Sequence, residues 1–100
     1  MKKEVKQQTD VNTFDDLKFY SHHYDRFGKI AQCRFPNDYG LSVVNGECAY
    51  CTADTFEVAI LHNGGITYDT PLTNDVLPSQ SKENINLLIK EVKSWDKDQY

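Results

Sequence analysis

The chain has 100 residues, of which 39% are hydrophobic and 26% charged, with a formal net charge of −4 and a pI near 5.2. This length fits one small domain, and the composition is typical of a globular chain, not of collagen, a coiled coil or a disordered protein. The apolar runs are too short for a membrane span. The modest acidity argues against direct nucleic-acid binding, which needs clustered positive charge. Met1 and two lysines are followed by polar residues instead of the apolar core of a signal peptide, so we expect a cytoplasmic protein.

The N-terminal part of the chain is expected to be irregular. Residues 1–12 hold too little apolar area to offset the entropy of ordering, so we predict a mobile tail there and a single domain over residues 13–100. Thr13 is a suitable N-cap for a short helix with Asp15 and Asp16 in its first turn. The segment 19–27 holds four aromatic residues and two histidines; we assign it to a flexible or partly helical N-terminal extension.

The middle of the chain carries the alternating pattern of β-strands. Strands are predicted at 29–35, 41–43, 56–60 and 66–68. Turn-forming residues at 36–40 and at 62–65 should join the first and the last pair as hairpins, and Asn63-Gly64 is a strong hairpin signal.

The C-terminal segment has the period of an amphipathic helix. Ile85, Leu88, Ile89 and Val92 share one face, and Trp95 extends it. Ser81 is the expected N-cap of this helix. The sequence therefore predicts an α+β domain, in which a four-stranded antiparallel β-meander is covered on one face by one C-terminal amphipathic helix.

The three cysteines, Cys33, Cys48 and Cys51, are an odd number in a chain without a secretion signal, so we expect reduced thiols. The spacing of Cys48 and Cys51 also allows a zinc site, completed by Cys33 and by His22 or His23. Because one close pair is only half of such a site, we expect no metal and no cofactor, and keep zinc binding as an alternative.

No group of residues in the sequence dictates a reaction. Asp69 and Asp75 flank Pro71, where such residues usually stabilise turns through hydrogen bonds to the backbone. Gly64-Gly65 is too short for a phosphate-binding loop and no Lys-Ser or Lys-Thr pair follows it. We therefore expect a protein without enzymatic activity.

The aromatic segment is the candidate site. Tyrosine, phenylalanine and arginine are the residue types that contribute most binding energy in protein interfaces. Adjacent histidines diverge on either a helix or a strand, so they do not combine in one site without further help. We predict a protein-binding surface, with the 47–54 loop as a neighbour, made of Phe19, Tyr20, His22, His23, Tyr24 and Arg26.

Three segments resemble a family of small uncharacterised bacteriophage proteins: YG-S-V at 39–43, FE-A-L at 56–61 and, most specifically, YDTP-T-DV at 68–76. The resemblance extends over about residues 29–95. It implies a phage accessory protein in the host cytoplasm that inhibits or modulates a bacterial host protein, such as a polymerase, a replication factor or a defence nuclease. An oligomeric structural component is a further alternative, because an uncovered sheet face favours self-association.

Overall fold

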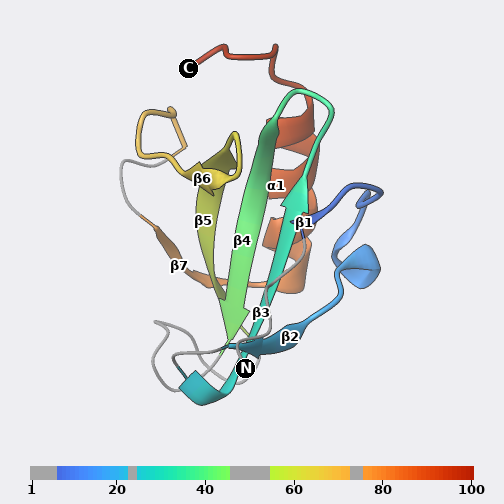
Figure 1. Ribbon diagram of the computed structural model, residues 1–100, viewed down its shortest axis with the longest axis vertical. Coiled ribbons are helices and arrows are strands. Elements are labelled where there is room, and N and C mark those ends of the chain that lie inside the picture. Colours follow the sequence, from blue (N-terminus) through green and yellow to red (C-terminus); the bar gives the residue numbers. More distant parts are fainter. Residues whose placement is uncertain (1–6, 23–24, 46–54, 73–75) are drawn as a thin grey trace.

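A computed structural model of the chain describes residues 7–22, 25–45, 55–72 and 76–100, without the side chains of 21–22 and 25–27 (Figure 1). The described part folds as a small α+β domain in which one helix lies against one face of a mixed sheet (Figure 1). The elements are β1 (Gln7–Gln8), the 3₁₀ turn η1 (Phe14–Asp16), β2 (Tyr20–His22), β3 (Asp25–Arg34), β4 (Tyr39–Asn45), β5 (Phe56–His62), β6 (Gly65–Ile66), β7 (Leu77–Gln80) and α1 (Lys82–Lys93).

Three long antiparallel strands, β3, β4 and β5, form the centre of the sheet. Ala31, Val43 and Val58 lie side by side across them in register. Each outer edge is shared by two short strands: β1 and β2 both pair with β3, and β6 and β7 both pair with β5. The central meander predicted from the sequence is therefore present, with additional strands on both sides of it.

The helix α1 covers the sheet through the apolar stripe that its sequence predicts. Ile85, Ile89 and Val92 are fully buried against the sheet, and Trp95 is 5% exposed just beyond the helix. Ser81 caps the N-terminus, because its side chain accepts a hydrogen bond from the backbone N–H of Asn84 at 3.1 Å. Leu88 is half-buried and packs at the margin of the core. No helix of the described residues is long and apolar enough to cross a membrane.

The N-terminal segment corrects one prediction, since residues 7–12 belong to the domain and not to a mobile tail. Gln7 and Gln8 pair in parallel with Gln32 and Cys33 of β3, which makes the sheet mixed. The side-chain amide of Gln8 also bonds to the backbone of Lys18 in the way that a neighbouring strand would. It donates to the Lys18 carbonyl at 2.8 Å and accepts from the Lys18 N–H at 2.9 Å. Val11 is 2% exposed in the core. Residues 1–6 lie outside the described part.

The aromatic segment corrects a second prediction, because its described part is extended instead of helical. Tyr20 of β2 pairs with Ile30 of β3, and a register shift follows after Ser21. The strand β3 begins at Asp25, earlier than its alternating pattern indicates. Aromatic residues suit a sheet well, and pairing with β3 satisfies backbone groups that a short isolated helix would leave exposed.

The second sheet edge also differs from the prediction. The expected strand 66–68 is reduced to Gly65–Ile66, and the unpredicted β7 occupies the rest of this edge. Pro78 lies within β7, where its missing N–H is tolerated because the strand is at the edge. The positive φ of Ser79, 55°, accompanies the irregular pairing of this strand.

Both predicted hairpin turns are confirmed. In the turn between β5 and β6, Asn63 and Gly64 have φ of 54° and 89°, as the Asn-Gly signal predicts. This turn folds over the sheet face opposite α1, because the carbonyl of Gly64 accepts a 3.1 Å hydrogen bond from the Gln7 side chain at the far edge. In the turn between β3 and β4, the Asp38 N–H donates to the carbonyl of Phe35 at 2.9 Å.

Candidate protein-binding surface

The residues predicted as one binding surface are divided by the sheet. Successive side chains of a strand point to opposite faces. Phe19 packs with the core on the helix side, so Tyr20 belongs to the other face, in line with Ile30. His22 and Arg26 lie in β2 and β3, but their side chains are not described, and His23 and Tyr24 lie outside the described residues.

On the helix side, Phe19 joins a second set of aromatic residues that the sequence did not connect with it. The ring of Phe14 lies 5.0 Å from that of Phe56 and 5.8 Å from that of Phe19, and Phe19 lies 5.8 Å from Phe56. The three tilted rings line an open pocket of about 300 Å³, together with Lys29, Asn45 and Lys82. We call these six residues the aromatic pocket.

Several contacts hold the rings in place. Phe56 is 9% exposed at the start of β5 and belongs to the core, while Phe14 and Phe19 are half-buried against it. The backbone N–H of Phe14 donates a 2.7 Å hydrogen bond to the Asn86 side chain of α1. The carboxylate of Asp16 accepts hydrogen bonds from the N–H groups of Asn12 and Thr13 and so fixes η1. The expected short helix is therefore a single 3₁₀ turn that presents Phe14.

Two lysines give the aromatic pocket a positive rim on a chain of negative net charge. Lys82 Nζ lies 5.5 Å from the centre of the Phe14 ring, within the range of a cation–π contact. Lys29 is exposed and lies beside Asn45 in the register of β3 and β4. In the described part of the chain neither lysine forms an ion pair.

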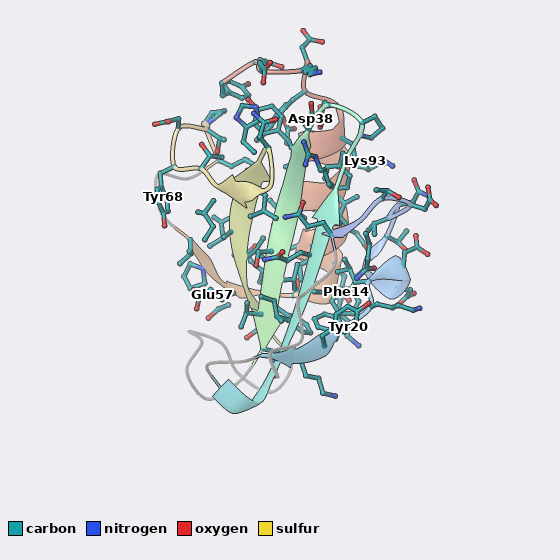
Figure 2. All side chains as sticks on the ribbon, in the orientation of Figure 1. Phe14, Tyr20, Asp38, Glu57, Tyr68 and Lys93 are labelled. Carbon is teal, nitrogen blue, oxygen red and sulfur yellow. The ribbon has the colours of Figure 1, made fainter. Side chains whose placement is uncertain are left out.

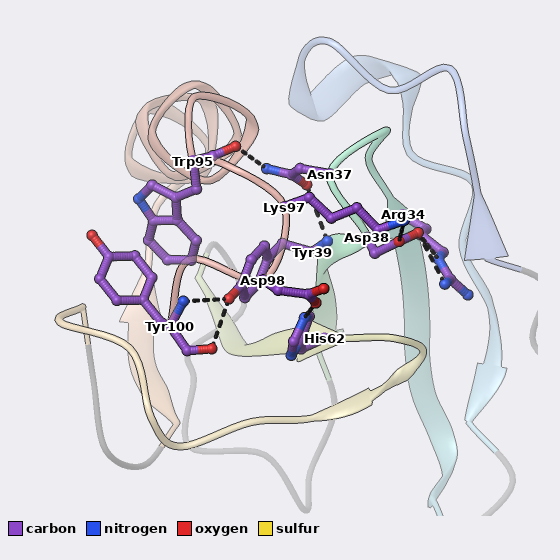
Figure 3. Close-up of polar contacts among 9 residues, drawn as sticks. All are labelled: Arg34, Asn37, Asp38, Tyr39, His62, Trp95, Lys97, Asp98 and Tyr100. Atoms are coloured by element: carbon purple, nitrogen blue, oxygen red, sulfur yellow. Dashed lines mark hydrogen bonds and ion pairs between the residues drawn. The ribbon is translucent and has the colours of Figure 1, made fainter.

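A second group of polar residues lies at the opposite end of the sheet, as the positions of Asp38 and Phe14 show (Figure 2). Here His62 Nε2 lies 2.7 Å from Asp98 Oδ1, and the ring of Tyr39 stacks on His62 at 4.3 Å (Figure 3). The Tyr39 hydroxyl donates to the carbonyl of Tyr100 and accepts from its N–H, at 3.0 and 2.8 Å. These contacts attach the C-terminal segment to β4 and β5.

The same end of the sheet holds a charge cluster on the β3–β4 turn. Asp38 accepts a 3.0 Å contact from Arg34 and lies 3.3 Å from Lys97 Nζ (Figure 3). Hydrogen bonds from these two cations lower the pKa of the Asp38 carboxyl below its usual value. The Asn37 side chain donates to the carbonyls of Val92 and Trp95 at the end of α1. The polar side chains here thus fasten the turn and the chain end together.

The cysteine that is described lies in the core. Cys33 is fully buried beneath α1, and burial raises the pKa of its thiol to about 11. Of the alternative zinc site, the structure therefore places only Cys33, which is enclosed by the core, while Cys48, Cys51 and His23 lie outside the described residues. Across the described ranges, no group of three His, Cys, Asp or Glu side chains is placed to hold a metal ion. Asp75, the partner considered for Asp69, also lies outside them.

Sequence reasoning missed five residues of the aromatic pocket, Phe14, Lys29, Asn45, Phe56 and Lys82. They come from η1, β3, β4, β5 and α1, and only the tertiary fold brings them together. The one local signal is Phe14, a large apolar residue within a polar, capped turn. A large apolar side chain at such a position indicates either a contact with the core or a binding role.

Comparison of the chain with known protein families, with curated proteins and with solved structures finds no match.

Proposed function

We propose that this chain is a non-enzymatic binding module whose aromatic pocket receives a side chain of another protein. The observation that carries the proposal is the aromatic pocket itself, with three rings as its wall and two lysines at its rim. A volume of about 300 Å³ is at the lower limit of small-molecule sites and suits one large side chain. The preferred partner segment carries an aromatic or branched apolar residue next to a carboxylate, which Lys29 and Lys82 attract.

The partner we propose is a bacterial host protein, bound by a phage accessory protein. The support for this identity is the resemblance of the 39–43, 56–61 and 68–76 segments to small phage proteins. The chain acts by steric blocking, because it offers a rigid apolar surface to a host polymerase, replication factor or defence nuclease. The prediction of a surface at Phe19 is retained in this proposal, while Tyr20 lies on the other face.

The test is affinity capture from lysates of candidate host bacteria, read by mass spectrometry, with the wild type and the double variant K29E/K82E as baits. Charge reversal is preferred to truncation of a phenylalanine because both lysines are exposed, whereas the rings support the core. The variant reverses the rim charge without removing a buried side chain, so we expect it to fold like the wild type. We expect a host protein that the wild type retains at near-equimolar amount and that K29E/K82E loses.

The control is K18E, since Lys18 is exposed and precedes Phe19 in the chain but does not line the aromatic pocket. This control should capture the same protein as the wild type. Equal capture by the wild type and K29E/K82E would show that binding, if any, occurs elsewhere, and would overturn the assignment of the aromatic pocket.

A further inference from the structure

The outer face of α1 carries an apolar residue that the described part of the domain leaves exposed. Leu87 is 64% exposed, the highest value among the large hydrophobic residues of the described part. At 3.6 residues per turn, Leu87 lies on the side of the helix opposite to Ile85 and Ile89, which are fully buried. Burying Leu87 in its own domain would require α1 to turn its core stripe away from the sheet.

Leu87 borders a hollow that continues its apolar surface. The hollow has a volume of about 440 Å³ and is lined by Leu72, Leu87, Leu88, Lys90, Glu91 and Ser94. Leu72 and Leu88 are half-buried and pack against the core, so the floor of the hollow is apolar and fixed. This surface is on α1 and the 70–72 segment, apart from the aromatic pocket.

The charged residues around Leu87 are complementary to the same residues of a second, antiparallel copy of α1. Glu83 lies four residues before Leu87 and Lys90 three residues after it, both on one side of the outer face. Asn84 and Glu91 occupy the equivalent positions on the other side. When two such helices pack antiparallel about a twofold axis at Leu87, Glu83 of each copy faces Lys90 of the other, and Asn84 faces Glu91.

The charged groups of Glu83, Lys90 and Glu91 have hydrogen-bonding atoms that face solvent. Glu83 and Lys90 are exposed, and in the described ranges of the chain neither of them forms an ion pair. Glu91 uses one carboxylate oxygen to accept the hydrogen bond from Trp95 Nε1 at 2.8 Å, which leaves its other oxygen for a second donor. In a parallel pair Glu83 would face Asn84 and Lys90 would face Glu91, so the antiparallel arrangement is the one that gives Glu83 a cation as its partner.

We propose that the outer face of α1 is a self-association surface, on which a second copy of the chain packs antiparallel with Leu87 at the twofold axis. The interface is isologous: each copy contributes the same leucine, the same hollow and both members of the ion pair. This inference does not rest on the proposed function, because it uses neither the aromatic pocket nor its rim. The resulting dimer carries two aromatic pockets.

The test is sedimentation equilibrium of the full chain at low salt, with the wild type, L87K, E83K, K90E and the double variant E83K/K90E. We expect a wild-type dimer and a monomer for L87K. Each single charge reversal places like charges across the axis and should raise the dimer dissociation constant at least about tenfold. The double variant restores opposite charges and should return to within about threefold of the wild type. Circular dichroism melts verify that each variant is folded.

Three results would overturn the proposal. The first is a wild type that stays monomeric at millimolar concentration, which would leave this face to a different partner. The second is a dimer whose dissociation constant is the same in L87K, which would place the interface elsewhere. The third is a double variant as weak as the single variants, which would exclude the antiparallel register.

Discussion

Tyr39 shows how a single residue organises one end of the molecule. It is fully buried, its ring stacks on His62 and meets Trp95 edge-on, and its hydroxyl has both a donor and an acceptor in the backbone of Tyr100. Buried tyrosines usually find such a partner for the hydroxyl. The His62–Asp98 pair lies beside this tyrosine and, like it, attaches the C-terminal segment to the sheet. We therefore assign the pair a structural role.

The pKa of Asp38 gives a prediction at the same scale. Its folded-state value is lowered by Arg34 and Lys97, so the charged carboxylate stabilises the fold above the unfolded pKa of about 3.9, and this contribution is lost as the pH falls through the folded value. Asp38→Asn keeps the side-chain shape and tolerates the positive φ of 68°. We expect a lower urea midpoint than the wild type at pH 7 and no difference near pH 2. A difference that is the same at both values would contradict this role.

Among the elements, α1 is the one that the sequence determines most completely. Its N-cap and its apolar stripe follow from local signals at Ser81, Ile85 and Val92, and both are confirmed. The Asn63-Gly64 turn is predictable for the same reason, because two adjacent residues specify its backbone angles. Local signals of this kind act within one turn of chain and need no knowledge of the fold.

The short edge strands are different, because nothing in their own residues specifies them. Gln7-Gln8 and Leu77–Gln80 have no alternating apolar pattern, and they are extended because β3 and β5 offer them unpaired backbone groups. The aromatic pocket was unpredictable for a related reason. Phe14, Phe19 and Phe56 meet only after η1, β2 and β5 are assembled.

Packing of α1 on the sheet predicts the effect of truncating its buried stripe. Ile89 is fully buried, so Ile89→Ala removes apolar contacts and leaves a cavity. We expect the free energy of unfolding to fall by about 2–5 kcal/mol in urea denaturation. The control is Leu87→Ala on the exposed face, measured at a concentration that keeps the chain monomeric, where the change should stay within about 0.5 kcal/mol. Equal losses for the two variants would contradict the orientation of α1.

At the scale of the whole molecule, the domain is completed by its N-terminal segment. Val11 enters the core, β1 pairs with β3, and Gln7 bonds to the turn of Gly64 across the sheet. Lys93 of α1 also donates to the Asn12 side chain at 2.6 Å. The segment therefore links the sheet, the helix and a distant hairpin.

Deletion of residues 1–12 tests this integration. Loss of the buried Val11 side chain and of the β1 hydrogen bonds should lower the free energy of unfolding by at least about 2 kcal/mol. The matched control is deletion of residues 1–6, which retains β1 and Val11 and should unfold near the wild-type midpoint. A full deletion as stable as the wild type would show that residues 7–12 act as a tail, as the sequence alone predicts.

Binding through the aromatic pocket is tested most directly by isothermal titration of the captured host protein, purified, into the wild type, K29E/K82E and K18E. We expect K29E/K82E to bind at least about tenfold more weakly than the wild type, a loss near 1.4 kcal/mol, while K18E binds within about twofold of it. An affinity that is unchanged in K29E/K82E, with the fold intact, would contradict the assignment of this surface to partner binding.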